Sequence, residues 1–392
     1  MTRVPGFRFS AVSAGIRKDG RIDTALAVCD HDATIAGVFT RNVVRAAPVT
    51  LAERRIASGK ARAVLVNAGC ANACTGEPGM QAAEASTAAI ARALGVDAAN
   101  VLPASTGVIG VVLPANRIVE QAERLVGGLS ADKSDDFSGA ILTTDRWPKI
   151  ASTTLTRDGK SATLLAIGKG AGMIHPDVGP PHATMLVFIF TDADVEAPEL
   201  RAALESATDD TFNSCTVDGD TSTNDTVLAW ASGVSGLKLT RKELTPALFE
   251  VCDVLARSMV KDGEGSEHMV EIRVRGLADT AAARSVARTV ATSLLVKTAI
   301  YGRDANWGRL LAAAGRAGVP FDPEQASIRI GDALIVERGM TTGAAAEARA
   351  SEILRTPEFT IELSLGSGPG SARYLTSDIG HAYVDVNASY RS

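Results

Sequence analysis

The clearest change in hydrophobic pattern lies near the middle of the chain, where a loop-forming segment meets an apolar run. Residues 169–183 are rich in glycine and proline, which disfavour regular structure. Residues 184–190 follow directly with the sequence Thr-Met-Leu-Val-Phe-Ile-Phe, a largely apolar run of strand length. This pattern predicts a buried strand that starts at Thr184, immediately after the small residue Ala183.

The rest of the chain mixes strand and helix patterns. Alternation and short apolar runs predict strands within residues 24–40, 63–67, 141–167, 326–337 and 358–364. Apolar positions at helical spacing predict helices over residues 80–94, 198–213, 280–293, and after a capping box formed by Thr240 and Glu243. The sequence Asp-His-Asp at 30–32 predicts a turn between two strands. Periodicity thus indicates mixed α and β structure without fixing the architecture.

Length and composition allow a large core and argue against some classes of partner. The 392 residues are 46% hydrophobic and 22% charged, enough for more than one domain. The net charge of -5 comes without a basic block, which argues against nucleic acid as the main partner. The first residues lack the apolar core of a signal peptide, and no run reaches the ~18 apolar residues of a membrane span. We therefore expect a cytoplasmic protein with no membrane partner.

The residues that most often bind metals are scattered. The chain has five cysteines and five histidines, without a Cys-x-x-Cys pair or histidines at metal-binding spacing. We expect neither a metal nor another cofactor.

Thr184 has a chemical role available if the chain is cut in front of it. The cut would give a threonine with both a hydroxyl and an α-amine, whose ordinary pKa is about 8. An N-terminal threonine that uses its own amine as the base is a known type of nucleophile. From the local residues alone, an ordinary strand start fits Thr184 better than this chemical role does.

Two further segments carry candidate chemistry. In Ser105-Thr106-Gly107, the glycine can leave backbone N–H groups free to bind a developing oxyanion, although such a sequence also forms ordinary turns. The polar run at 217–225 resembles a calcium loop in composition but lacks the required glycine and glutamate positions. We expect this run to brace an active site through side-chain hydrogen bonds to the backbone.

Taken together, these motifs resemble the ornithine acetyltransferase family, the bifunctional glutamate and ornithine N-acetyltransferases of arginine biosynthesis. The resemblance extends over nearly the whole chain. It is carried, in order, by Ala-Gly-Val-Phe-Thr at 36–40, Ala-Asn-Ala-Cys-Thr-Gly at 71–76, Ser-Thr-Gly-Val-Ile-Gly at 105–110, Thr-Thr-Asp at 143–145, Lys-Gly-Ala-Gly-Met-Ile-His-Pro at 169–176, Ala-Thr-Met-Leu at 183–186, Asp-Gly-Asp-Thr-Ser-Thr-Asn-Asp at 218–225, Lys-Asp-Gly-Glu-Gly at 261–265, Asn-Trp-Gly-Arg at 306–309 and Asn387.

The resemblance implies an α/β fold of stacked mixed β-sheets flanked by helices, an αββα sandwich, with a smaller α/β lobe over roughly residues 240–350. It also implies self-cleavage between Ala183 and Thr184. The resulting chains, about 1–183 and 184–392, would stay together and assemble into a homo-oligomer of processed pairs.

The implied reaction moves an acetyl group from N2-acetylornithine to L-glutamate through an acetyl-Thr184 intermediate, with acetyl-CoA left open as a second donor. By match to the family's motifs, Thr106 and Gly107 form the oxyanion hole. The residues implied to contact substrate are Thr143, Lys169, Thr184, Glu264, Asn387 and Ser392. Lys169 suits an α-carboxylate and Glu264 suits the δ-amine of ornithine, but each also fits a structural ion pair.

Two departures from the family pattern leave alternatives open. The segment between Pro176 and Ala183 is four residues longer than usual, and self-cleavage needs a well-aimed peptide bond. Within this loop, His182 fits either an extra base or an exposed residue. His268 stands where the family usually has lysine, a change that could alter substrate choice. The alternatives are a relative with another acyl donor or acceptor, an N-terminal-nucleophile aminopeptidase that hydrolyses its acyl-enzyme, and an uncut, inactive relative.

Overall fold

The computed structural model describes residues 2–175 and 185–388. The described residues form two compact units, each considered by itself. Those of the first unit lie within Met1–Gly170, Pro176–Asn213 and Thr221–Leu255, and those of the second lie within Ala171–His175, Ser214–Asp220 and Ala256–Ser392. The predicted division before Thr184 and the predicted lobe at 240–350 stay predictions.

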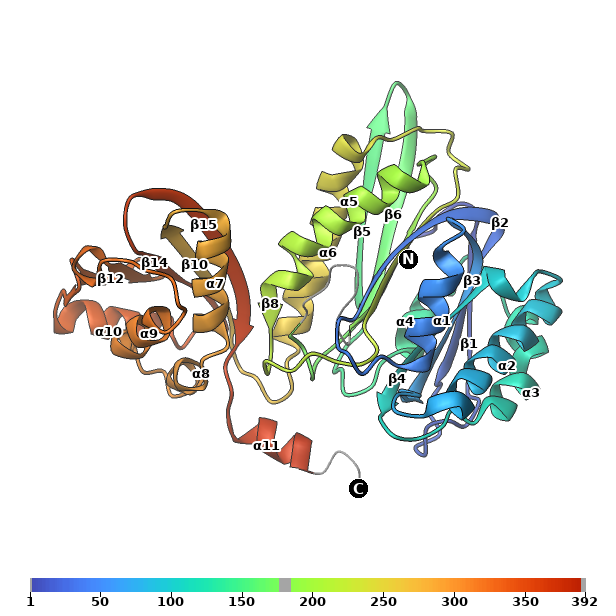
Figure 1. Cartoon of the computed structure of the whole chain (residues 1–392), viewed down its shortest axis with the longest axis horizontal. Coiled ribbons are helices and arrows are strands. Elements are labelled where there is room, and N and C mark those ends of the chain that lie inside the picture. The colour runs from blue at the N-terminus through green and yellow to red at the C-terminus, as the bar shows by residue number, and fades with distance from the viewer. Residues whose placement is uncertain (1, 176–184, 389–392) are drawn as a thin grey trace. The chain divides into compact units, whose positions relative to one another are not determined.

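The first unit is built on an eight-stranded mixed sheet (Figure 1). The strand order is β4-β3-β2-β9-β7-β6-β5, with β1 also paired to β2. The pairs β3–β4 and β7–β9 are parallel and the other pairs are antiparallel. The strands are β1 (Phe7–Val12), β2 (Thr24–Phe39), β3 (Lys60–Cys70), β4 (Val101–Val108), β5 (Lys149–Arg157), β6 (Lys160–Lys169), β7 (Leu186–Thr191) and β9 (Thr226–Ala231).

The long strand β2 joins the two halves of this sheet. Its residues Thr24–Val28, Ala33 and Thr34 pair with β3, and Thr34–Phe39 pair with β9. The turn predicted at residues 30–32 is wrong, because β2 runs through it with a shift in register between Val28 and Ala33. A bulge of this kind interrupts the alternation of side chains without ending the strand.

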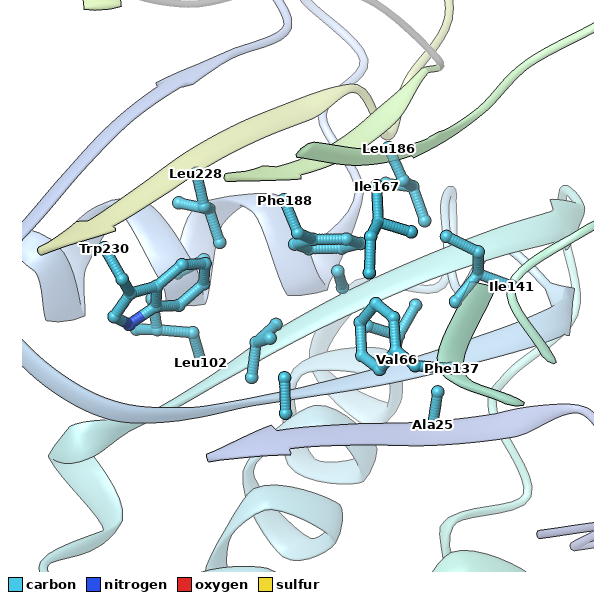
Figure 2. Close-up of a cluster of buried hydrophobic side chains, with 14 of the residues drawn as sticks. Ala25, Val66, Leu102, Phe137, Ile141, Ile167, Leu186, Phe188, Leu228 and Trp230 are labelled. Atoms are coloured by element: carbon cyan, nitrogen blue, oxygen red, sulfur yellow. The ribbon is translucent and has the colours of Figure 1, made fainter. Parts of the chain in front are cut away.

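The two halves of the sheet face each other across a common core. Figure 2 shows Val66 and Leu102, from β3 and β4, turned toward Phe188 and Trp230, from β7 and β9. The rings of Phe190 and Trp230 stack with their centroids 5.4 Å apart, a separation typical of favourable aromatic pairs. Stacked mixed β-structure, expected from the family resemblance, is therefore present within the first unit.

Helices cover the outer faces of both halves. Buried residues of α2 and α3 pack on the outward-facing side chains of β2 and β3, and β5 is linked to α6 by a hydrogen bond from Thr153 to Glu250. The end at residue 94 of the helix predicted over residues 80–94 is confirmed, with Gly95 as its cap, and so is the predicted contact of Thr240 with Glu243. The helices are α1 (Ala47–Ile56), α2 (Gly76–Leu94), α3 (Ala115–Gly127), α4 (Ser134–Ala140), α5 (Ala197–Asp210) and α6 (Arg241–Lys261), whose last six residues belong to the second unit.

The second unit has its own seven-stranded mixed sheet, in the order β13-β12-β11-β14-β10-β15-β8. The sequence patterns at 326–337 and 358–364 correspond to β11, β12 and β14. The strands are β8 (Cys215–Thr216), β10 (Met269–Gly276), β11 (Ser327–Ile330), β12 (Ala333–Glu337), β13 (Met340–Thr341), β14 (Glu358–Ser364) and β15 (Gly368–Ser377).

Four helices share one apolar core with this sheet (Figure 1). They are α7 (Thr280–Ala291), α8 (Leu294–Tyr301), α9 (Trp307–Gly315) and α10 (Ala344–Ile353), and a further helix, α11 (His381–Ala388), follows β15. Among the described residues, no helix is long and apolar enough to cross a membrane. The same residues contain no cluster of three or more His, Cys, Asp or Glu placed to hold a metal ion.

Candidate active site

Thr106 and Gly107 lie at the end of β4, where this strand pairs with β3. Gly107 sits opposite Gly69, and the register shifts at the next residue, Cys70. The backbone of Gly107 has φ 131°, and a Cβ there would lie 2.3 Å from the Gly69 carbonyl carbon. Only glycine fits this close approach of two backbones, and its conformation fixes the direction of the neighbouring Thr106.

Side-chain amides hold the backbone around Thr106 in place. Asn224 Nδ2 donates to the carbonyls of Ala71, at 2.6 Å, and Ser105, at 2.8 Å. On the other side, Asn67 accepts a hydrogen bond from the Ser105 hydroxyl, at 2.6 Å, and donates to the Cys70 carbonyl. The side-chain hydrogen bonds to the backbone that were predicted for the 217–225 run are thus present at Asn224.

Lys169, the last residue of β6, contacts the Thr106 side chain. Its ammonium nitrogen donates to Thr106 Oγ1 at 3.3 Å, and both residues are buried. An ammonium group can only donate a hydrogen bond, so Thr106 Oγ1 accepts this one. The proton of the Thr106 hydroxyl therefore points away from Lys169. This arrangement prepares the Thr106 hydroxyl to donate a hydrogen bond to a negatively charged oxygen.

Asp145 connects Lys169 to a second buried lysine. Its carboxylate lies 2.7 Å from Lys149 Nζ and 4.0 Å from Lys169 Nζ, and it accepts hydrogen bonds from the backbone N–H of Thr143 and Gly170. Burial acts to raise the pKa of Asp145, but the two ammonium groups and the hydrogen bonds from Lys149 and Gly170 outweigh it and lower the pKa to about 2. Asp145 is therefore ionised and organises Thr143 and Lys169 around one carboxylate.

Asp225 is a second acidic residue whose pKa is affected by the charge of Lys169. Its side chain is completely buried, and neither carboxyl oxygen has a hydrogen-bond partner in the part of the chain that the structure describes. Burial raises the pKa of Asp225 well above its usual range, although the nearby Lys169 acts to lower it. The structure therefore favours a neutral carboxylic acid at this position.

In the second unit, Glu264 and Asn387 lie together. Asn387 Nδ2 donates to Glu264 Oε2 at 2.9 Å, and the Glu264 backbone N–H donates to the Ala171 carbonyl. Gly172 packs directly against the Glu264 carboxylate, because a Cβ on Gly172 would lie within 2.4 Å of both carboxylate oxygens. The Glu264 carboxylate thus packs against Gly172 and accepts a hydrogen bond from the Asn387 amide. It can also accept a hydrogen bond from a cation.

Asp218 fixes the segment that precedes the loop at 176–184. Its carboxylate accepts from the backbone N–H groups of Met173, at 2.6 Å, and Ile174, at 3.0 Å. Burial raises the pKa of Asp218 to about 6 despite these bonds. Burial and the nearby carboxylates, Asp218 among them, also raise the pKa of Tyr383.

His268 lies in the interior of the second unit. Its side chain is buried, and its Nδ1 lies 2.8 Å from the Asp378 carboxylate. Asp378 also accepts hydrogen bonds from the backbone N–H groups of Glu267 and His268. His268 therefore takes part in a buried hydrogen bond that joins the start of β10 to the residue after β15.

The structure gathers the predicted site residues into two groups. Thr106, Gly107, Thr143 and Lys169 lie in the first unit, and Glu264 and Asn387 lie in the second. The predicted cleavage pair Ala183–Thr184, His182, the longer loop and Ser392 lie outside the described residues. Sequence reasoning did not assign roles to three residues of the first group: Asp145, Lys149 and Asp225. Asp145 and Asp225 stand in motifs that carried the resemblance, but nothing in the sequence separated them from other polar residues there.

The comparisons with known proteins agree with one family. The ArgJ family model matches residues 8–392. The arginine biosynthesis bifunctional protein ArgJ of Geobacter sulfurreducens is 45% identical, over 99% of this chain and all of that protein. Its counterpart from Nitratidesulfovibrio vulgaris is 44% identical, over 99% of this chain and 98% of its own length.

A solved structure gives a further likeness. The crystal structure of the arginine biosynthesis bifunctional protein ArgJ from Bacillus halodurans is 37% identical and covers 52% of this chain and 98% of that chain, with a TM-score of 0.50. Because the family model spans nearly the whole sequence and full-length relatives exceed 40% identity, this chain belongs to the ArgJ family.

Proposed function

We propose that the protein cleaves itself between Ala183 and Thr184 and then uses Thr184 to carry an acetyl group from N2-acetylornithine to L-glutamate. As a member of the ArgJ family, the protein is an acetyltransferase of arginine biosynthesis. The cleavage, the nucleophile and the substrates form the proposal.

The single observation that carries the proposal is the geometry at the start of β7. Leu186, separated from Thr184 by one residue, pairs with Lys169, whose ammonium contacts the Thr106 hydroxyl. The strand that follows the proposed nucleophile is therefore anchored beside the candidate oxyanion hole. Both faces of β7 are buried, which would keep the second chain attached after a cut.

The proposed chemistry begins with attack of the Thr184 hydroxyl on the Ala183 carbonyl. Transfer of the acyl group from nitrogen to oxygen frees the Thr184 amine and leaves an ester. Water hydrolyses this ester, which releases the Ala183 carboxylate and restores the Thr184 hydroxyl. That amine then takes the hydroxyl proton while Thr184 attacks the acetyl carbonyl of N2-acetylornithine, and it returns the proton to the departing α-amine of ornithine. Attack by the amine of glutamate on the acetyl ester completes the cycle.

The residues of the first unit would stabilise the negatively charged oxygen that forms in each step. Thr106 and the backbone of Gly107 supply the donors, and one such donor is typically worth about 3–4 kcal/mol in the transition state. Thr143, Lys169, Glu264 and Asn387 stay proposed substrate contacts, with Lys169 suited to an α-carboxylate and Glu264 suited to the δ-amine of ornithine. Ser392, the homo-oligomer and the cytoplasmic location stay predictions.

Substitution of Thr184 tests the proposal. Thr184→Ala should abolish both chain cleavage and acetyl transfer, and Thr184→Ser should retain part of each, because a hydroxyl remains. Thr208→Ala, at a buried threonine in α5 whose hydroxyl donates to the Leu204 carbonyl, is the matched control and should leave both reactions in place. Acetyl transfer by the Thr184→Ala variant would overturn the proposal, and release of free acetate instead of acetylglutamate would identify a hydrolase.

A further inference from the structure

Arg17 lies in the loop between β1 and β2 and contacts a second loop of the first unit. Its guanidinium group donates from Nη1 to the Leu142 carbonyl at 2.5 Å. Leu142 lies between α4 and β5, 125 residues further along the chain. The Arg17 side chain is only 10% exposed, so this hydrogen bond is largely shielded from water. The chemistry proposed above does not use this long-range contact.

The peptide unit that Arg17 contacts is the one that precedes Thr143. Its carbonyl, on Leu142, accepts from Arg17, and its N–H, on Thr143, donates to the Asp145 carboxylate at 3.1 Å. Side chains of opposite charge therefore hold the two polar groups of one peptide, and hydrogen bonds to ionised groups are roughly twice as strong as neutral ones. Because a peptide unit is planar, fixing both groups fixes its orientation and the position from which the Thr143 side chain extends.

The backbone of Arg17 is itself held by a buried carboxylate. Asp23, just before β2, is 0% exposed. Its carboxylate accepts hydrogen bonds from the backbone N–H groups of Ala14 at 2.8 Å, Ile16 at 2.6 Å and Arg17 at 2.9 Å. The Asp23 carbonyl accepts from the Ala68 N–H in β3 at 2.8 Å. The Arg17 side chain therefore extends from a segment that is fixed to the eight-stranded sheet.

The stem of Arg17 meets the strand pair that carries the candidate oxyanion hole. A Cβ added at Gly69 would lie 2.9 Å from Arg17 Cγ and 3.5 Å from Arg17 Cα. Gly69 sits opposite Gly107 across β3 and β4. Arg17 therefore packs on the backbone beside Gly107 while its guanidinium group holds the peptide before Thr143.

We propose that Arg17 is a positioning residue for acetyl transfer, whose guanidinium group orients the peptide before Thr143 so that Thr143 meets the substrate. This inference rests on the proposed function, because that function makes Thr143 a substrate contact. Arg17 acts through Thr143 and needs no contact of its own with the substrate.

The inference predicts that the two reactions of the protein respond differently to loss of the guanidinium group. Self-cleavage occurs within one chain and needs no amino-acid substrate, whereas transfer also needs the contacts that hold N2-acetylornithine. Loss of the Leu142 contact should therefore leave cleavage in place and raise the KM for N2-acetylornithine. The kcat should change little, because a contact made equally in the ground and transition states affects KM.

The first test is Arg17→Met. Methionine keeps an unbranched stem that can pack on Gly69, but it cannot donate to the Leu142 carbonyl. We expect a KM about tenfold above that of the parent, at the low end for a hydrogen bond to a charged group. Arg21→Met is the matched control and should keep the parent KM: Arg21 lies in the same loop and pairs with the same carboxylate, that of Asp19, but its side chain is 58% exposed.

A small guanidinium compound gives a second readout. In an Arg17→Ala variant, the side chain is lost beyond Cβ, and ethylguanidinium supplies the missing atoms. Added ethylguanidinium should lower the KM of this variant toward that of the parent. Ethylammonium at the same concentration has the same charge but lacks the planar set of donors, and it should have little effect.

The fluorescence of Trp147 gives a readout that does not depend on the reaction. Trp147 lies in the same loop as Leu142 and is half-buried. In a Trp307→Phe background the other tryptophan, Trp230, is 1% exposed, so quenching by acrylamide reports mainly on Trp147. Arg17→Met should be quenched more than Arg21→Met, because its loop has lost an anchor. Arg17→Lys, which keeps one donor, should give intermediate quenching and an intermediate KM, and it replaces Arg17→Met if that variant does not fold.

Three results would overturn the inference. They are a parent-like KM and parent-like quenching in Arg17→Met, equal effects of the two added cations, and loss of cleavage together with transfer, which would show a general structural role. Intact-mass measurement of cleavage and acetylation in the parent tests the proposed function separately. If the parent does neither, the proposed function fails, whereas quenching of Trp147 still shows whether Arg17 positions this loop.

Discussion

Replacing Asp145 by asparagine should destabilise the first unit by about 2–5 kcal/mol. The side chains of Asp145 and Lys149 are both 0% exposed, and Lys169 is nearly as buried. Loss of the carboxylate charge would remove the counter-ion that lies 2.7 Å from Lys149 Nζ and 4.0 Å from Lys169 Nζ. Removal of one partner of a buried ion pair typically costs about 3–5 kcal/mol.

The lowered pKa of Asp145 gives a second estimate of the same quantity. The difference between its ordinary value of 3.8 and about 2 corresponds to about 2.5 kcal/mol. Because folding lowers this pKa, the stabilisation is present above pH 3.8 and is lost as the pH falls toward 2. At neutral pH the full contribution is available for the substitution to remove.

The assay is urea unfolding followed by tryptophan fluorescence. A Thr184→Ala background keeps every variant as one chain, so that cleavage does not alter the unfolding transition. Adding Trp307→Phe leaves Trp147 and Trp230, both in the first unit, as the reporters.

The matched control is Glu205→Gln, which removes an ion pair with Arg201 whose side chains are 62% and 37% exposed. It should change stability by no more than about 0.5 kcal/mol. If Asp145→Asn also stays within about 0.5 kcal/mol of its parent, the reasoning about a buried charged cluster is refuted. A double variant, Asp145→Leu with Lys149→Met, should lose less stability than the two single changes added together, because the direct contact between the two side chains is then lost once and not counted twice.

Two other predictions concern the second unit. Gly172→Ala should weaken the binding of N2-acetylornithine as strongly as Glu264→Gln does, because the added Cβ would displace the Glu264 carboxylate. A KM for N2-acetylornithine close to that of the parent would show that this carboxylate does not contact the substrate. Asp218→Asn should abolish a loss of stability that the parent shows as the pH rises from 3.8 to about 6. Folding raises this pKa, so the contribution is complete below 3.8 and about 3 kcal/mol is lost above 6. Parallel curves of unfolding free energy against pH for variant and parent would contradict that assignment.

Much of the fold could be predicted from local patterns. The strand after Thr184, the strands within residues 141–167, the end of the helix at residue 94 and the cap at Thr240 each depend on residues close in sequence. The turn expected at 30–32 failed because polar residues mark both turns and bulges. Pairing with β3 and β9, which are distant in sequence, decided between the two.

The candidate site likewise contains residues that a local motif identifies and residues whose surroundings depend on the folded sheet. Thr106, Gly107 and Lys169 were identified by motif, and the structure places Thr106 and Lys169 in contact. The burial of Asp145 and Asp225 could not be predicted, because each depends on strands brought together by the folded sheet. The sequence shows two ordinary aspartates, whereas the structure gives one a pKa of about 2 and the other a pKa well above the usual range.

The central claim is that Thr184 becomes a chain terminus and carries the acetyl group. The most direct test is an intact-mass spectrum of the purified protein before and after mixing with N2-acetylornithine. The account predicts two chains that divide between Ala183 and Thr184, of which the one beginning at Thr184 gains one acetyl group. A single uncut chain, or two chains of which neither is acetylated, would contradict it.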